Sequence, residues 1–470
     1  MRHILTLSLF IASAICGPAR AADDARPLNI LLITADDLGL QLSCYGDKVI
    51  KTPHLDRLAA GGAQFDVAYV AQASCSPSRS AMFTGLYPHT NGQYGLTNSG
   101  NFQMHARSHD ATIPALLKKV GYRTGIIGKL HVGPEKVFPF DDRPRVNTRQ
   151  VRDVAKAARD FLARDGKFFL MVNYSDPHAY RTSRESRDWY FPAQIDGLPE
   201  KPIQPGDAPP WPFQGIDEPE QLKKVANYYN CVLRLDAGVG MLLDALDKSG
   251  HADDTLVIFV GDHGPPFARG KTTCYEAGLR VPFMVRWPGG SKPMKSEAMV
   301  STVDILPTIL DAAGVVPPKE LHGRSLRPVV SSGDAPWRKY LAGEFHFHGS
   351  SPFFPRRAIR DDRYKLIHNL MAGKTKPSTG IDGDRAYPLS QQPKYQDTPT
   401  RRAFDTFADP PEFELYDLKN DPNELNNLAG KADLAEVQQR MKAALEQWRK
   451  ETGDPFMSAA FVEKVGAEKR

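Results

Sequence analysis

The stretch that most constrains this chain is residues 73–92, where a cysteine, a proline and an arginine precede a short apolar segment at fixed distances. Pro77 fits the first turn of a helix, the neighbouring serines can cap its start, and Gly85 can end it. Cys75 is thus predicted just ahead of a helix start, where backbone N–H groups and the helix dipole attract anions. Taken alone, such a cysteine is more often an ordinary buried or disulfide-bonded residue.

Four apolar runs, each followed by charged residues, form the second constraint. Short unbroken apolar runs are typical of buried parallel strands, and here they alternate with helical periodicity. The charged residues that follow the runs are Asp36 with Asp37, Lys129 with His131, Asp176 with His178, and Asp262 with His263. Each pair alone could lie in a solvated turn. Because ligands bind at the C-terminal edge of such a sheet, the four pairs together predict a site there.

The same periodicity predicts an α/β fold with a large, mostly parallel central sheet flanked by helices. Its strands are expected at residues 29–37, 124–127, 168–172, 255–260 and 281–287, and its helices at 52–60, 112–120, 151–163 and 221–246. Residues 179–215 and 371–412 are Pro- and Gly-rich and are expected to be long loops that link elements or wall a pocket.

Beyond residue 340 the pattern changes to a smaller antiparallel sheet with one packing helix. Strands are expected at residues 340–347, 363–368 and 413–416, and the helix near 434–450. We therefore divide the chain into a signal peptide (residues 1–21), a catalytic domain (22–339) and a C-terminal subdomain (340–470).

Residues 1–21 combine a basic start, an apolar run and an Ala-Arg-Ala end, which is typical of a cleaved secretory signal. This predicts a secreted or periplasmic protein, and no later stretch has the length and apolarity of a membrane span. Of 60 Lys and Arg, two leave with the signal, so the mature charge is +3 against 55 Asp and Glu. Without a basic stripe, we expect no nucleic-acid partner and a small anionic substrate.

The number of cysteines bears on disulfides, and the acidic residues bear on a metal site. Four cysteines remain after the signal, too few and too scattered for a disulfide framework. Asp36, Asp37 and Asp262 would repel one another without a cation, so a divalent metal is predicted. Calcium or magnesium suits carboxylate oxygens, whereas the nitrogen of His263 leaves the metal less certain.

The cysteine motif, together with the Gly-Leu-Tyr-Pro of residues 85–88, resembles the signature of the type I sulfatases, whose cysteine becomes formylglycine. The resemblance implies the alkaline-phosphatase-like sulfatase fold, a maturation enzyme as a partner and one divalent cation, Ca²⁺ or else Mg²⁺. It makes Cys75, Arg79, Lys129, His131, His178 and Lys271 catalytic, and Asp36, Asp37, Cys75, Asp262 and His263 metal ligands. Residues 270–282 resemble the segment that carries a sulfate-binding cation, here Lys271.

The resemblance also implies a mechanism. The formylglycine at position 75 is hydrated to a gem-diol, and one of its hydroxyls attacks sulfur. Lys129, His178, Lys271 and the metal neutralise the sulfuryl oxygens, and His178 protonates the leaving group. His131 then takes the proton from the second hydroxyl as sulfate is expelled.

Within the sulfatases, the chain most resembles the heparan N-sulfatases, which cleave N-sulfoglucosamine. The matching stretches are residues 75–80, 91–96, 125–135, 138–141, 176–178 and 366–370. Lys271 stands where those enzymes have arginine, and the two long loops diverge, so an O-sulfatase acting on another glycan or an aryl sulfate is the alternative. Asp176, His346 and His348 are candidate substrate-binding residues, although the histidine pair could simply be exposed. A homodimer is a further expectation.

Two other functions fit the same fold. Alkaline phosphatases and phosphodiesterases place Ser or Thr where Cys75 stands and bind two zinc ions. A non-catalytic glycan-binding protein could keep the scaffold, but the intact cysteine, arginine and histidine set argues against it.

Overall fold

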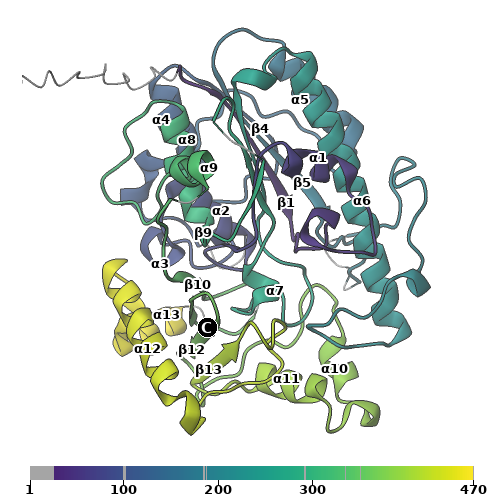
Figure 1. Ribbon diagram of the computed structural model, residues 1–470, viewed down its shortest axis with the longest axis vertical. Helices are drawn as coiled ribbons and strands as arrows, with labels where there is room; N and C mark the ends of the chain where they lie inside the picture. Colours follow the sequence, from purple (N-terminus) through teal and green to yellow (C-terminus); the bar gives the residue numbers. More distant parts are fainter. Residues whose placement is uncertain are drawn as a thin grey trace, which may run out of the picture.

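The computed structural model describes residues 26–98, 102–183, 186, 188–290, 293–333, 335–349 and 351–468. Figure 1 shows a large layered region in its upper part, with a smaller sheet and two C-terminal helices below it. The predicted signal peptide, residues 1–21, lies outside the described residues. Among the described residues, every helix falls short of the length and apolar character that a membrane crossing needs.

The larger sheet has seven strands, in the order β4-β5-β1-β6-β7-β2-β8. These strands are β1 (Asn29–Asp36), β2 (Ala63–Phe65), β4 (Arg123–Gly128), β5 (Phe168–Pro177), β6 (Thr255–Gly261), β7 (Phe283–Arg286) and β8 (Met294–Ser296). β4, β5, β1 and β6 are parallel, whereas β7 runs antiparallel to β6. The prediction of a mostly parallel central sheet is confirmed.

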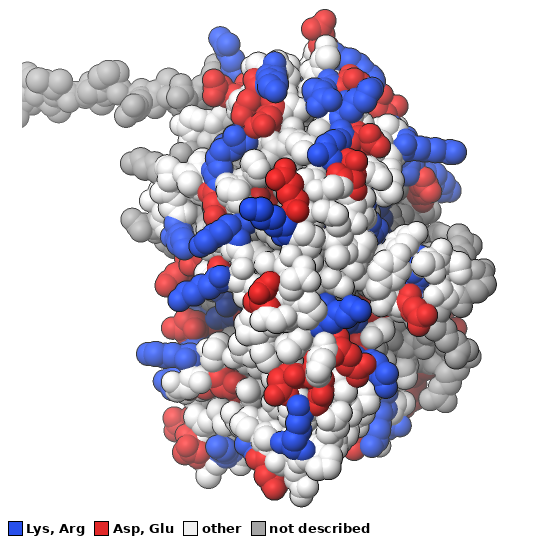
Figure 2. Space-filling model, turned by 90° about the vertical axis from the view of Figure 1, so that its right-hand side faces the viewer, with Lys and Arg blue, Asp and Glu red and all other residues white. Residues whose placement is uncertain are grey.

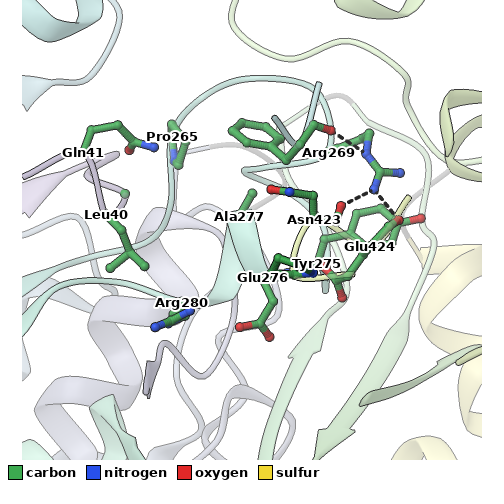
Figure 3. Close-up of a pocket in the computed structure, with 13 residues that line it drawn as sticks. Leu40, Gln41, Pro265, Arg269, Tyr275, Glu276, Ala277, Arg280, Asn423 and Glu424 are labelled. Carbon is green, nitrogen blue, oxygen red and sulfur yellow. Dashed lines mark hydrogen bonds between the residues drawn. The ribbon is translucent and has the colours of Figure 1, made fainter. Parts of the chain in front are cut away.

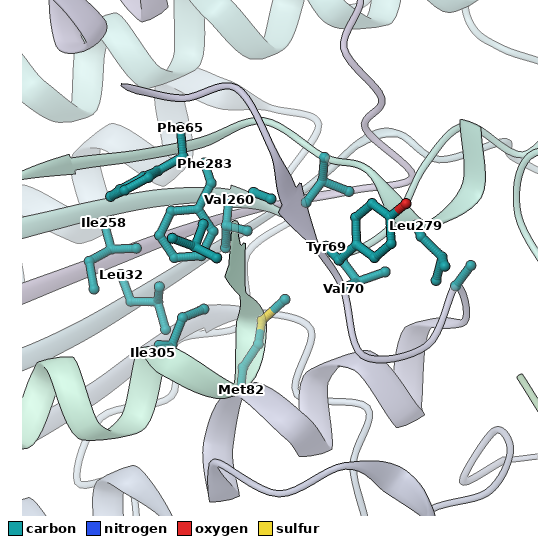
Figure 4. Packing of buried hydrophobic residues seen from close by; sticks show 14 of the residues in the cluster. Leu32, Phe65, Tyr69, Val70, Met82, Ile258, Val260, Leu279, Phe283 and Ile305 are labelled. Carbon is teal, nitrogen blue, oxygen red and sulfur yellow. The ribbon is translucent and has the colours of Figure 1, made fainter. Parts of the chain in front are cut away.

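β1 is buried on both faces, which explains its unbroken apolar sequence. Ile30 and Leu32 point into one hydrophobic cluster, Leu31 and Ile33 into another, and all four are fully buried. Figure 4 shows the first cluster, where Leu32 lies near Ile258 of β6. Such burial on both faces is typical of parallel strands covered by helices.

Helices cover both faces of this sheet (Figure 1). One cluster receives apolar residues from α2 (Cys75–Thr84), α4 (Ile113–Lys119), α8 (Ile305–Ala312) and α9 (Arg327–Ser332). The other receives them from α1 (Pro53–Ala60), α5 (Val151–Leu162) and α6 (Pro219–Lys248). In α5, Val151, Val154, Ala155 and Ala158 are buried at helical spacing, so one face of this helix packs on the sheet.

The smaller sheet has four antiparallel strands, β10 (Leu341–Phe345), β11 (Arg356–Arg360), β12 (Tyr364–Asn369) and β13 (Phe413–Asp417). Met441 and Leu445 of α12 (Ala435–Glu451) pack against Ile359 and Leu366 of this sheet. The predicted C-terminal antiparallel sheet and helix are therefore confirmed. β11 was not predicted, because its Arg-Arg-Ala-Ile-Arg sequence lacks the apolar pattern of a strand.

The prediction of a continuous loop at residues 371–412 is wrong. This segment contains α10 (Ala386–Ser390) and α11 (Pro399–Ala408). The Thr398 hydroxyl caps α11 by accepting from the Arg401 N–H, and Phe404 and Phe407 are buried one turn apart. The remaining elements are α3 (Pro88–Asn91), α7 (Glu276–Leu279), α13 (Ala459–Glu468), β3 (Ala68–Tyr69) and β9 (Val300–Ser301).

Surface charge on one face agrees with the near-neutral composition. Figure 2 shows basic and acidic side chains interspersed over the side that carries α5 and α6, without a continuous basic stripe on it. This face therefore offers no track for a long polyanion.

Candidate active site

The four charged pairs predicted at the strand ends converge at the C-terminal edge of the large sheet. Asp36 ends β1 and Asp37 follows it, while Asp262 and His263 directly follow β6. All four are at least 98% buried. Asp37 adopts a φ of 67°, and its N–H donates to Asp262 Oδ1 at 2.9 Å. These turns bring the carboxylates of two neighbouring strands together.

Cys75 is the first residue of α2, one position later in the helix than predicted. Its Sγ lies 3.6 Å from Asp36 Oδ1 and 3.2 Å from His263 Nε2. Ser74 stands at the N-cap, but its hydroxyl contacts His348 Nδ1 at 2.9 Å instead of capping the helix. Gly85 ends the helix in the left-handed conformation with φ 66°, as predicted. The cysteine therefore faces both the acidic pairs and a helix N-terminus.

Arg79 lies one turn after Cys75, fully buried, and ties three strand ends together. Its Nε donates to Asp262 Oδ2 at 3.0 Å and its Nη1 to the Lys129 carbonyl at 3.0 Å. Nη1 also donates to Asn173 Oδ1 at 2.8 Å. Asn173 on β5 was missed by the sequence analysis, because an asparagine inside an apolar strand carries no local functional signal.

Lys129 forms an ion pair with Asp36, with 2.7 Å between Nζ and Oδ2. Burial alone would raise the pKa of Asp36, but Lys129, His178 and Arg79 hold it well below its usual range. Burial and Asp36 together raise the pKa of Asp262. Neighbouring carboxylates thus differ sharply in their affinity for a proton, as expected when like charges share a low-dielectric site.

Lys271 is buried between two carboxylates. Its Nζ lies 3.0 Å from Asp37 Oδ1 and 2.8 Å from Asp382 Oδ2. Burial opposes its charge, yet these two neighbours raise the lysine pKa well above its usual value. Asp382, in the long segment between β12 and β13, was also missed. Its placement depends on the folding of that whole segment, and no residue beside Asp382 in the sequence marks it as a partner of Lys271.

His131, which follows β4, and His178, which follows β5, differ in the contacts that their rings make. His178 Nδ1 contacts its neighbour's carbonyl, Ala179 O, at 2.5 Å, which leaves Nε2 on the side of Asp37, 3.9 Å from Oδ2. His131 Nε2 contacts Asn98 Oδ1 at 3.1 Å, and its buried Nδ1 has no hydrogen-bond partner among the described residues. Burial and then Lys129 lower the pKa of His131 to about 2, so this ring is neutral.

The acidic group has the chemistry of a cation site. Ligand atoms of Asp36, Cys75, Asp262 and His263 lie within 4.8 Å of one another, as do those of Asp36, Asp37, Cys75 and His178. Asp37 Oδ1 is buried and accepts no hydrogen bond from the described residues. Burial alone would lower the pKa of His263, but Asp262 and the groups beside it raise it to about 10. The surroundings therefore favour positive charge, and the residues fit a divalent cation with oxygen ligands.

The three candidate substrate-binding residues are all buried. Both Asp176 oxygens accept from Arg234 of α6, at 2.7 and 2.9 Å. The His346 ring is fully buried against Phe456, and His348 contacts Ser74. The alternative that His346 and His348 are an exposed pair is wrong, because the small sheet packs both rings inward.

One cavity borders the cluster, and another lies along the segment that follows β6. The first, about 450 Å³, opens onto Asp36, Lys129 and His178 and is walled by Trp189 and Tyr180 from the predicted loop at residues 179–215. Figure 3 shows the second, about 220 Å³, lined by Arg269, Glu276 and Glu424 among others. There Arg269 donates to the carbonyls of Asn423 and Glu424, so it joins the segments around the cavity.

Comparisons with known proteins agree with this arrangement. The family described as Sulfatase matches residues 28–315, and the family described as N-sulphoglucosamine sulphohydrolase, C-terminal, matches residues 261–377 and 401–451. The chain is 35% identical to human N-sulphoglucosamine sulphohydrolase, over 93% of this chain and 92% of that protein. It is 32% identical to an ulvan-active sulfatase of Formosa agariphila, over 91% and 80%.

A similar solved structure contains a protein in complex with its substrate, D-glucosamine-2-N,6-O-disulfate. The two share a TM-score of 0.66 at 23% identity, covering 92% of this chain and 99% of the other. That likeness establishes the alkaline-phosphatase-like sulfatase fold. With the family matches above, it shows that the chain belongs to the sulfatase family, the hydrolases of sulfate esters and sulfamates.

Proposed function

We propose that this enzyme removes the N-sulfate from glucosamine at the non-reducing end of short heparan-type saccharides. The observation that carries the proposal is the cysteine at the start of α2, held 3.6 Å from Asp36 within a buried acidic cluster. Similarity to N-sulphoglucosamine sulphohydrolase over 93% of the chain supports the choice of substrate. The cavity of about 450 Å³ suits a small ligand.

The proposed nucleophile is an oxygen at position 75, made when a maturation enzyme oxidises Cys75 to formylglycine. Asp36, Asp37, Asp262 and His263 would hold a divalent cation, Ca²⁺ in our proposal, which supplies a Lewis acid at this oxygen when bound. Arg79 fixes Asp262 through its Nε and the Lys129 loop through its Nη1. The nucleophile and the residues around it are therefore positioned before substrate arrives.

Substrate binding and proton transfer are assigned to the remaining cations and histidines. Lys129 and Lys271 carry positive charge towards the cluster and would neutralise the sulfate oxygens. His178 Nε2 faces the site and would protonate the departing amine, which is more basic than a sugar hydroxyl. His131, neutral and with an unpaired Nδ1, would accept a proton when sulfate leaves.

The test of this proposal measures sulfate released from a panel of defined saccharides. We expect N-sulfoglucosamine to be cleaved faster than 6-O-sulfated, N-acetylated glucosamine or 2-O-sulfated uronate. Mass spectrometry of the tryptic peptide that contains residue 75 should show the mass of an aldehyde side chain in place of a thiol. Faster cleavage of the 6-O-sulfated, N-acetylated sugar would contradict the proposed specificity, and an unmodified thiol in active enzyme would contradict the nucleophile.

An O-sulfatase acting on another sulfated glycan is the second candidate. Two observations favour it. Lys271 stands where the sulfamidases have arginine, and the chain is 32% identical to an ulvan-active sulfatase. Lysine offers a point charge, whereas arginine offers a planar pair of donors, so the two bind sulfate differently. The same panel separates the two candidates.

We further propose secretion through residues 1–21 and a boundary near residue 340 between the catalytic domain and the C-terminal subdomain. The boundary is supported by the change from the mostly parallel sheet to the antiparallel sheet that begins at β10.

A further inference from the structure

We propose that the active-site cleft continues into a second subsite, which binds an anionic group on the sugar next to the N-sulfated one. This inference rests on the proposed function, because it concerns the saccharide that this function supplies. The anionic group is a carboxylate or a sulfate ester, and Arg145 is the residue that binds it.

A further cavity, of about 810 Å³, adjoins the catalytic one. Lys129 and Ser175 line both cavities, so the two share a wall at the ends of β4 and β5. The added volume lies within the range of small-ligand sites and is larger than the catalytic cavity itself. A saccharide whose terminal sugar occupies the first cavity can therefore extend past Lys129 into the second.

The second cavity is basic, and its basic groups are not equivalent. Arg143 Nη1 forms an ion pair with Glu135 Oε1 at 2.5 Å, so its charge is already matched. Arg145, two residues later, is exposed, and no hydrogen bond or ion pair joins its guanidinium to any of the described residues. The subsite thus contains one cation, Arg145, that has no partner within the part of the chain that the structure describes.

The other arginine near the shared wall is already engaged. Arg149 Nη2 donates to the His178 carbonyl at 2.7 Å, and its Nε lies 3.5 Å from Asp176 Oδ1. It fixes the loop that carries His178 and has little freedom to follow a ligand. Arg145 is therefore the residue that can turn towards a ligand in this cavity.

A guanidinium with free donors suits a carboxylate or a sulfate ester, because its planar fork can donate two parallel hydrogen bonds. Hydroxyls supply further polar contacts at the shared wall, where Thr148 Oγ1 and Ser175 Oγ lie 2.7 Å apart. A single unpaired guanidinium can bind a single anionic group. The substrate is then a short saccharide with a charged second sugar.

The experiment compares kcat/KM for sulfate release from four substrates. They are N-sulfoglucosamine alone, its disaccharide with a uronate, the same disaccharide with the carboxyl reduced to an alcohol, and the 2-O-sulfated uronate disaccharide. We expect the uronate disaccharide to exceed its reduced form about tenfold, through KM with kcat unchanged, because the contact is remote from sulfur. A gain with the 2-O-sulfated form alone would identify the sulfate ester as the bound anion.

Variants then assign the effect to one side chain. Arg145→Ala should reduce the preference for the anionic disaccharide to less than about twofold, and Arg145→Lys should restore part of it. Arg159→Ala, an exposed arginine on α5 outside both cavities, is the matched control and should keep the preference. Added salt should weaken the preference in the wild-type enzyme.

The outcomes separate this inference from the proposed function. Sulfate release from N-sulfoglucosamine with equal kcat/KM for the uronate disaccharide, its reduced form and the 2-O-sulfated disaccharide would overturn the second subsite alone. A preference that survives Arg145→Ala as fully as it survives Arg159→Ala would also overturn it. Absence of release from every N-sulfated substrate would overturn the proposed function and this inference with it.

Discussion

Two clusters of buried charge, one at the edge of the large sheet and one beside the small sheet, are built from similar residues and differ in how they are paired. Beside the small sheet, Arg357 donates to both oxygens of Asp454, each at 2.8 Å, and Arg449 adds a third bond at 2.7 Å. Glu344 accepts from the His89 N–H at 2.8 Å. The carboxylates here each have close cationic partners within the protein.

At the edge of the large sheet the balance is different. Three aspartates, Asp36, Asp37 and Asp262, lie together, and Asp37 Oδ1 accepts no hydrogen bond from the described residues. His263 Nε2 lies 3.1 Å from that oxygen. Lys129, Arg79 and Lys271 pair with these aspartates, but ligand atoms of Asp36, Cys75, Asp262 and His263 also lie within 4.8 Å of one another, as a cation site requires.

Replacing Cys75, the proposed source of the nucleophile, should separate activity from stability most clearly. We expect Cys75→Ala to lower kcat/KM by about 10⁴-fold or more, because no oxygen nucleophile can then form. Its fold should survive, which thermal unfolding can check. Cys274→Ala is the matched control, since Cys274 is a fully buried cysteine of the hydrophobic core. It should lower the unfolding temperature and leave kcat unchanged. Activity in Cys75→Ala above a trace would show that the cluster has been assigned to the wrong chemistry.

Removing the metal is the second test. Exhaustive chelation should lower turnover by about 10³-fold, since a Lewis acid contributes several kcal/mol, and Ca²⁺ or Mg²⁺ should restore it better than Zn²⁺. It should also lower the unfolding temperature, because the three aspartates then repel one another. In Asp262→Asn the chelator should shift this temperature less. An unchanged rate, with no metal found by elemental analysis, would mean that the edge cluster is another internal salt-bridge network.

Sequence patterns could predict the edge cluster because each half of it is local. Apolar runs that end in charged pairs mark where parallel strands stop, and the Ser-Cys-Ser-Pro sequence marks where α2 begins. The fold brings these local features to one edge without further information. Strand ends and helix starts were therefore predicted to within a few residues.

The cluster beside the small sheet could not be predicted, because burying its arginines is favourable only when they pair with acidic residues that are distant in the sequence. β11 carries Arg356, Arg357 and Arg360, and nothing nearby in sequence suggests that they are buried. Arg357 meets Asp454 across 97 positions. Asp382 could not be predicted for the same reason, since its partner Lys271 is 111 positions away in the sequence. By contrast, α11 was missed although Thr398 and Pro399 are ordinary helix-start signals, so closer attention to capping could have found it.

Breaking the paired cluster should affect stability and leave catalysis unchanged. Arg357→Ala removes the bidentate partner of Asp454 and a guanidinium that lies 3.6 Å from Glu344 Oε2, so the free energy of unfolding should fall by about 3 kcal/mol. Urea denaturation measures this fall, and kcat per folded molecule should stay within about twofold. Arg363→Ala is the matched control, because Arg363 pairs with Asp417 at 2.7 Å but is 46% exposed. Its loss should lower the free energy of unfolding much less than Arg357→Ala does, because solvent screens an exposed ion pair. Equal losses in the two variants would show that burial does not distinguish these pairs.

The smallest effect concerns two histidines whose pKa values move in opposite directions. Among the aspartates, the pKa of His263 rises to about 10, whereas burial lowers that of His346 to about 3, although Glu344 opposes the change. Since an unfolded histidine titrates near 6.5, the unfolded chain binds a proton at position 346 between about pH 6.5 and 3 that the folded protein does not. Stability is therefore lost as pH falls through this window.

His346→Asn removes that titration while its side-chain amide can still donate to Gln72 Oε1, which lies 2.8 Å from His346 Nδ1. We expect the fall in unfolding free energy between pH 7 and pH 5 to be about 2 kcal/mol smaller in the variant than in the wild type. Urea denaturation at pH 7, 6 and 5 measures the difference. Parallel curves for the two proteins would mean that the pKa of His346 is the same in the folded and the unfolded chain, with Glu344 offsetting burial. A wild-type protein that loses less stability than the variant as pH falls would mean that Glu344 outweighs burial and holds this histidine charged, as the aspartates at the edge of the large sheet do for His263.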